Sequence, residues 1–172
     1  IMEDKSVEHE LVIEDDYRKT KENLKQRYFF PLNQETNFKL NKFFRKITKE
    51  KKQLSKILNI KGRNFQIKNF YEGISRFNFQ DLCDQNLGAE DYLEIAKNSN
   101  FIVIEKIPQF NDINSNQQKR FITLLDIIYD KNIPIAVSAT QGLEKLTSSK
   151  SLEQEFKRSI SRLYELTSKD FK

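Results

Sequence analysis

Two short apolar segments, at residues 101–107 and 133–139, constrain the fold of this chain more than any other feature of its sequence. Continuous apolar runs of this length are typical of strands that are buried on both faces, as they are in parallel sheets. Between them lies a helical pattern that ends at Asp130, and its apolar stripe consists of Phe121, Leu124, Leu125 and Ile128. A strand, a helix and a second apolar strand in this order predict a parallel βαβ unit with flanking helices.

The residues before this unit predict short strands and a β-hairpin. Apolar runs at 11–13 and 28–30 are typical of short strands. Alternating residues on both sides of a Lys-Gly-Arg turn at 61–63 indicate a hairpin, and a further strand is expected at 73–79. The predicted fold class is therefore α/β, with short strands and a hairpin or meander followed by the βαβ unit.

Three further helices are expected from apolar residues at helical spacing. The first begins near Gln34, after a cap at Asn33, and ends around Glu50. The others span about 89–97 and 152–166. The residues expected to point inward are Leu40, Phe43, Phe44 and Ile47 in the first helix, Tyr92, Leu93 and Ala96 in the second, and Phe156, Ile160 and Leu163 in the last.

The composition argues against several kinds of site. The chain has 172 residues with one cysteine, Cys83, and one histidine, His9. These are too few for a zinc cage, and they leave a Ser-His-Asp triad without a credible base. No metal ligand and no catalytic residue is therefore expected, and the single cysteine suits a cytoplasmic setting. No apolar run approaches the roughly 18 residues of a membrane span.

The sequence also lacks the motifs of a self-sufficient ATPase. None of its four glycines begins or completes a G-x-x-x-x-G-K-[ST] loop, whose backbone amides would hold phosphates. No strand ends in Asp-Glu, and the strand at 101–107 carries Glu105-Lys106 instead. We expect Glu105 to be a solvated or paired charge at the end of that strand.

A basic stretch between Lys39 and Arg63 contains a single acidic residue, Glu50. The residues that form its possible binding face are Lys39, Lys42, Lys46, Lys49 and Arg63. Such a face suits the phosphate backbone of a nucleic acid, and the aromatic residues that follow suit stacking on bases, so the alternative function is a stand-alone nucleic-acid-binding module. The interpretation that we favour is that the lysines are a solvated surface and the aromatic residues form the core. A net charge of +5 is compatible with both.

Two arginines in the last predicted helix, Arg158 and Arg162, lie one turn apart on one face. Their planar guanidinium groups can bind a phosphate or a carboxylate. Glu155 and Glu165 are near enough in sequence to neutralise them. The sequence leaves open whether this is an anion site or a salt-bridged surface that contributes little to stability.

Several segments together resemble the ZapE-type P-loop ATPase family, which includes the mitochondrial "ATPase family gene one" proteins. They are D-Y-R at 16–18, Y-F-x-P-L at 28–32, G-R at 62–63, F-x-F-x-E-L-C at 77–83 with aspartate for glutamate, D-Y-L at 91–93, R-F-I-x-L-I-D-x-x-Y-D at 120–130 with leucine for isoleucine, and F-x-R-x-x-S-R-L-x-E-M at 156–166 with leucine for methionine. No single segment is specific, but their order and spacing cover nearly the whole chain.

The resemblance implies a C-terminal portion of an AAA+-related ATPase that remodels partner proteins, in bacteria at the division septum. Residues 1–32 would be an N-terminal extension with the first strands from the missing core, and residues 33–172 a C-terminal α/β domain. ATP and magnesium would belong to the full-length protein, with no cofactor in this chain. Expected partners are the N-terminal ATPase core, further copies assembled through that core, and a division or client protein. Arg158, Arg162 and Arg120 are the candidates to reach a neighbour's nucleotide.

We predict that this chain alone hydrolyses no ATP, because it lacks the phosphate loop and the Asp-Glu strand. Phosphate release measured with the purified chain should equal that of the buffer. Release above this background, abolished by substituting a residue of this chain, would contradict the prediction.

Overall fold

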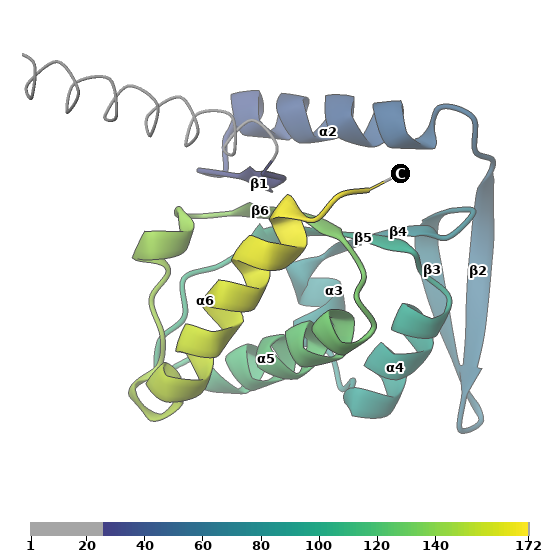
Figure 1. Cartoon of the computed structure of the whole chain (residues 1–172). Coiled ribbons are helices and arrows are strands. Elements are labelled where there is room, and N and C mark those ends of the chain that lie inside the picture. The colour runs from purple at the N-terminus through teal and green to yellow at the C-terminus, as the bar shows by residue number, and fades with distance from the viewer. Residues whose placement is uncertain (1–25, 172) are drawn as a thin grey trace, which may run out of the picture.

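A computed structural model describes residues 26–171, which form a six-stranded mixed sheet (Figure 1). The order across the sheet is β1-β6-β5-β4-β3-β2. The strands are β1 (Tyr28–Phe29), β2 (Gln53–Ile60), β3 (Arg63–Tyr71), β4 (Ile74–Asn78), β5 (Phe101–Ile107) and β6 (Ile135–Ala139). The α/β class is confirmed, whereas the strand expected at 11–13, His9 and the D-Y-R segment lie outside the described residues.

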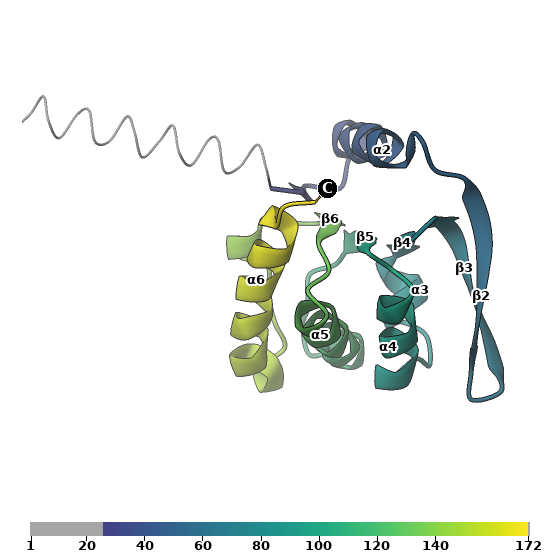
Figure 2. The ribbon, with the colours of Figure 1, turned by 45° about the vertical axis from the view of Figure 1, so that its right-hand side comes forward.

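The helices lie in two layers, one on each face of the sheet (Figures 1 and 2). They are α2 (Gln34–Thr48), α3 (Phe79–Cys83), α4 (Ala89–Lys97), α5 (Ser115–Asp130) and α6 (Glu153–Ser168), with the short 3₁₀ turns η1 (Leu143–Lys145) and η2 (Lys150–Leu152). Helix α2 covers one face, and α3 to α6 cover the other. None of the helices in the described part of the chain has both the length and the apolar character needed to cross a membrane.

The predicted βαβ unit is β5–α5–β6, and its two strands are parallel. Strand β4 also pairs with β5 in parallel, and β1 with β6. Residues 101–104 of β5 are completely buried. A strand with parallel neighbours on both sides and a helix layer on each face has no solvated side, which explains its continuous apolar sequence.

Helix α2 begins where its capping residue predicts. The side chain of Asn33 accepts a hydrogen bond from the backbone N–H of Thr36 at 2.9 Å. Leu40 and Phe44 are buried against Ile74, Phe101 and other residues of the sheet. Phe43 and Ile47 pack at the edge of this cluster and stay partly exposed.

The larger core lies on the opposite face of the sheet, beneath α5. Phe121, Leu125 and Ile128 of α5 are fully buried, as the sequence predicts. Phe121 also packs against Phe79 and Phe110, with each ring centroid 5.7 Å away. These contacts join α3 and the loop after β5 to the helix layer.

The prediction for α4 was wrong at one position. Leu93 was expected to point inward but is 44% exposed, and Ile95 is buried instead. Tyr92, Ile95 and Ala96 follow the i, i+3, i+4 spacing of one helical stripe, and Leu93 lies about 100° away from Tyr92 around the helix. Ile160 of α6 is likewise only partly buried.

The hairpin of β2 and β3 is longer than the sequence indicates. Its two-residue turn, Lys61 and Gly62, has φ angles of 50° and 81°. Positive values at both central positions are typical of the tight turns that match the twist of a hairpin. Next to the turn, Arg63 pairs with Asp91 at 2.7 Å and Lys61 pairs with Glu90, so the tip of the hairpin is attached to α4.

Replacing Leu125 by alanine should lower the free energy of unfolding by about 2–5 kcal/mol, because it opens a cavity between α5 and the sheet. Lys119→Ala, on the exposed side of the same helix, should change it by less than about 0.5 kcal/mol. Urea denaturation of both variants measures the difference. Equal effects of the two substitutions would place Leu125 outside the core.

Candidate functional site

Arg158 and Arg162 of α6 meet on one carboxylate of the neighbouring helix α5. Nη2 of Arg158 lies 3.3 Å from Oδ2 of Asp126, and Nη1 of Arg162 donates to Oδ1 of the same residue. The helical spacing brings both guanidinium groups to one side of α6, and the packing of α6 against α5 supplies the acid. Asp126 can compensate only one of the two positive charges.

Tyr129, one turn beyond Asp126 on α5, completes this cluster. The guanidinium carbon of Arg162 lies 4.5 Å from the centroid of the Tyr129 ring, in the arrangement of a cation–π contact. The carboxylate of Glu165 also acts on the phenol and raises the pKa of Tyr129. The cluster therefore holds Arg162 on three sides, through a carboxylate, a ring and the helix itself.

The two arginines differ in how much of each side chain solvent can reach. The side chain of Arg162 is 22% exposed and that of Arg158 is 52% exposed. Arg162 therefore contributes to the α5–α6 contact, whereas about half of the Arg158 side chain is open to solvent. Glu155 and Glu165 were expected to neutralise the arginines, but the ion-pair partner is Asp126. Residue spacing within α6 reveals neighbours on that helix alone, and Asp126 becomes a neighbour only when α5 and α6 pack.

Arg120, the third arginine candidate, lies apart from this cluster. Its Nη1 donates to the carbonyl oxygen of Cys83 at 3.1 Å, at the end of α3. This bond satisfies a backbone acceptor that the end of a helix leaves unpaired. Cys83 itself is fully buried, as expected, and burial raises the pKa of its thiol. Arg120 thus links α5 to α3.

The four lysines expected to form a basic face lie on α2 or at its end, but Arg63 does not lie beside them. Lys39, Lys42, Lys46 and Lys49 are exposed, and Lys39 pairs with Glu35 at 3.2 Å. Arg63 lies at the tip of the hairpin, at the opposite end of β2 from α2 (Figure 2).

The aromatic residues that follow this basic stretch belong mainly to the core. Phe70 and Phe77 are buried, and Phe65 and Tyr71 pack against the core clusters. They offer no open row of rings on which bases could stack. The aromatic part of the nucleic-acid hypothesis therefore lacks support in the described residues.

Glu105 is a paired charge, which is one of the two outcomes expected for it. Its oxygens accept hydrogen bonds from Nε and Nη2 of Arg76, both at 2.8 Å. The pair is largely enclosed, with side chains 15% exposed for Arg76 and 13% for Glu105. Arg76 also lies over the ring of Phe44 at 4.6 Å. Within residues 26–171, no three side chains of the metal-binding types gather into a possible metal site.

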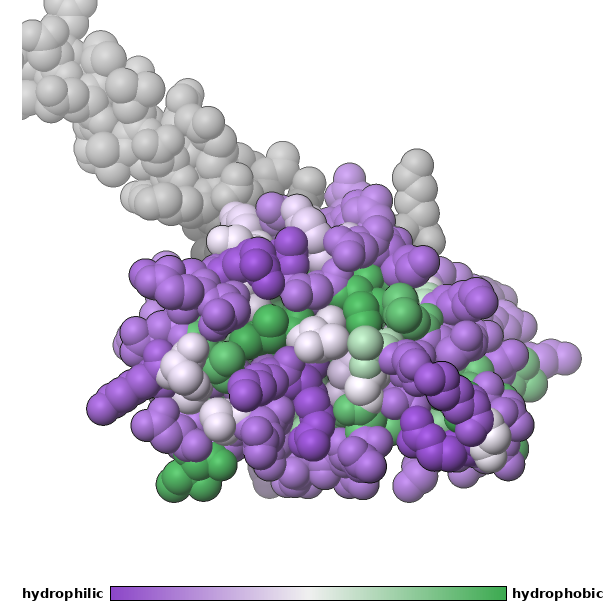
Figure 3. Space-filling model, turned by 90° about the horizontal axis from the view of Figure 1, so that it is seen from below, coloured by the Kyte–Doolittle hydropathy of each residue, from purple (hydrophilic) through white to green (hydrophobic). Residues whose placement is uncertain are grey.

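A cleft of about 1120 Å³ runs between β1 and α6. Its walls include Phe30 and Tyr164, which are 51% and 45% exposed, together with Leu143 and Ile160. Strand β1 is only two residues long and forms one edge of the sheet. The side of the molecule that α3 to α6 cover is mostly hydrophilic, and its apolar groups lie in separate patches (Figure 3).

Residues 10–172 match the family model described as AFG1-like ATPase. The chain belongs to the AFG1-like ATPase family. The matched range includes the segment of α6 that carries Arg158 and Arg162 and the segment of α5 that carries Asp126.

Two relatives illustrate the similarity of this AFG1-like chain to characterised proteins. "Lactation elevated protein 1 homolog B" of Danio rerio is 35% identical over 91 residues, which are 53% of this chain and 18% of that protein. "Cell division protein ZapE" of Escherichia coli K12 is 25% identical over 141 residues, which are 82% of this chain and 38% of that protein. The aligned part thus spans less than two fifths of either relative. No solved structure matches the chain.

The geometry predicts unequal effects of removing the two arginines. Arg162→Ala should lower the free energy of unfolding by about 1–2 kcal/mol, since it removes a partly buried ion pair and a cation–π contact. Arg158→Ala should lower it by less than about 0.5 kcal/mol, because its pair is exposed and the distance is long. Urea denaturation tests both. A larger loss for Arg158 than for Arg162 would contradict the geometry.

Proposed function

We propose that this chain works as the C-terminal part of a ZapE-like protein-remodelling ATPase, without an ATP-hydrolysis site of its own. In this role it packs on the ATPase core and engages partner proteins or neighbouring subunits. The family match supports the assignment to an ATPase, and the chain corresponds to under two fifths of either relative described above. The sequence contains no phosphate loop, which fits a part that depends on another segment for nucleotide.

The observation that carries this proposal is the arginine pair on one aspartate. An arginine that reaches the nucleotide of a neighbouring subunit stabilises the charge that develops on the γ-phosphate. Arg158 suits this role because its side chain is half exposed, and Asp126 holds it through a single long contact. Arg162 positions it by fixing Asp126 and the α5–α6 contact. Arg120, already bonded to α3, is the weaker candidate.

The cleft between β1 and α6 supports docking on the core. It combines exposed aromatic side chains with a short edge strand. An apolar surface of this kind on a domain is a common sign of a protein interface. We assign the ATPase core to this side of the domain and the neighbouring subunit to the arginine side of α6.

The test uses the complete ATPase that contains this chain, with Arg158→Ala as the variant. We expect the turnover number to fall by at least tenfold, with ATP binding retained, since only the transition state gains charge that the arginine would stabilise. Lys157→Ala, the adjacent exposed cation on α6, is the matched control and should leave turnover unchanged.

Assembly and turnover should be measured on the same samples. If Arg158→Ala leaves both at the level of the unsubstituted protein, the arginine has no role in the ATPase and the proposal for this site is wrong. If Lys157→Ala lowers turnover equally, the effect reflects the general charge of α6 and not a positioned guanidinium group.

A further inference from the structure

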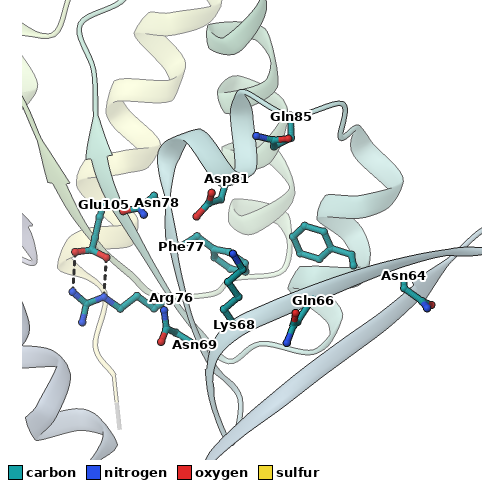
Figure 4. A pocket seen from close by; sticks show the side chains of 11 residues that line it. Asn64, Gln66, Lys68, Asn69, Arg76, Phe77, Asn78, Asp81, Gln85 and Glu105 are labelled. Atoms are coloured by element: carbon teal, nitrogen blue, oxygen red, sulfur yellow. Dashed lines mark hydrogen bonds and ion pairs between the residues drawn. The ribbon is translucent and has the colours of Figure 1, made fainter.

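A cleft of about 640 Å³ opens between the β2–β3 hairpin and the segment formed by the end of β4 and α3 (Figure 4). Strand β3 pairs with β2 in regular register from Arg63 to Ile67, the register shifts at residues 68–69, and β3 pairs with β4 only at residues 69–71. The hairpin therefore separates from the sheet at Lys68. Within the described residues, no strand pairs with the second edge of β3 at residues 63–68.

The backbone of this part of β3 points hydrogen-bonding groups into the cleft. In a hairpin with a two-residue turn, the flanking residues, here Ile60 and Arg63, form a hydrogen-bonded pair. Every second pair along the register has the same geometry. The N–H and C=O groups of Asn64 and Gln66 therefore point away from β2, toward the cleft. They form a strand edge that is ready to pair with another backbone.

The side chains around the cleft also suit a peptide. Five carboxamides contribute both donors and acceptors, namely Asn64, Gln66, Asn69, Asn78 and Gln85. Phe65 and Phe77, with ring centroids 6.4 Å apart, add an apolar surface. Lys68 of β3 and Asp81 of α3 face the cleft from opposite sides (Figure 4).

The walls of the cleft are fixed at both ends. At the tip of the hairpin, Arg63 pairs with the buried carboxylate of Asp91 on α4. At the other end, Arg76 pairs with Glu105, so these two charges compensate each other. Lys68 and Asp81 then leave the cleft with no excess of either sign, which favours a ligand with little net charge and an apolar side chain.

We propose that this cleft binds an extended polypeptide segment, which adds a strand to the unpaired edge of β3. The edge from residue 63 to residue 67, where the register with β2 is regular, spans about 14 Å at the usual rise of a strand, which matches about five residues of a partner. Backbone hydrogen bonds supply affinity in such complexes, and side-chain pockets supply specificity. This site is separate from the arginine pair, so it does not depend on the function proposed for that pair.

The first experiment leaves the protein unchanged. Peptides are selected from a random heptapeptide library on the 172-residue chain, and the tightest binder is resynthesised with each backbone amide N-methylated in turn. Methylation at alternate positions should weaken binding about tenfold, because each of these methyl groups removes one hydrogen bond to the edge of β3. Methylation at the positions between them should change the affinity less than about threefold. Equal sensitivity at all positions, or a library that gives no binder, would overturn the proposal.

The second experiment uses two opposite residues of the hairpin. Gln66 and Ile57 are cross-strand partners, but the N–H of Gln66 points into the cleft and that of Ile57 toward the outer edge of β2. Neither N–H belongs to the β2–β3 ladder, so proline is compatible with both positions. Gln66→Pro should weaken peptide binding at least tenfold, and Ile57→Pro should leave it unchanged.

The outcome assigns the edge that the peptide uses. Equal weakening by both substitutions, or weakening by Ile57→Pro alone, would place the peptide elsewhere and overturn the proposal. If circular dichroism shows that the Gln66→Pro variant is unfolded, the alternation in the N-methyl series decides whether the peptide pairs with the edge of β3. Competition by a second copy of the chain, with no binding of extended peptides, would identify the edge as a self-association surface and also contradict the proposal.

Discussion

The burial of β5 on both faces is the constraint on which the rest of the structure depends. Phe101 and Val103 face α2, whereas Ile102 and Ile104 belong to the core beneath α5. Burying each of these side chains contributes about 1.5–3 kcal/mol, so neither face of the strand can be left in water without a large loss. Helices must therefore cover both faces, and this requirement places α2 opposite the other helices.

The same layering creates the arginine cluster. Helices α5 and α6 pack side by side over the sheet, so Asp126 comes within reach of two side chains that are more than thirty residues away in sequence. Arg27 anchors the other side of α6, since its Nη2 donates to the carbonyl oxygen of Leu166 at 3.0 Å and its Nε to that of Ile135 at 2.9 Å. Partial burial of this guanidinium group lowers the pKa of Arg27. The position of α6, and with it the direction of Arg158, is thus fixed from two sides.

The elements that carry the proposed binding surfaces, α6 and the β2–β3 hairpin, lie at opposite ends of the sheet (Figure 2). The arginine cluster and the cleft with exposed aromatic residues lie on either side of α6, next to β1 and β6. The peptide cleft lies at the other end, where β3 separates from β4. In the two proposals, one end of the sheet contacts an ATPase core and the other holds an extended polypeptide segment, and the sheet keeps the two surfaces apart.

The sequence by itself determined the local elements of this protein. The apolar runs, the Asn33 cap and the turn at Lys61-Gly62 predicted the βαβ unit, the start of α2 and the hairpin, because each depends on residues close together in the chain. Only the tertiary structure decided that Asp126 pairs with both arginines, that Arg63 lies far from the lysines of α2, and that β3 keeps an unpaired edge. These features depend on helix packing and on the point at which two strands separate, and neither is encoded in the periodicity of a single segment.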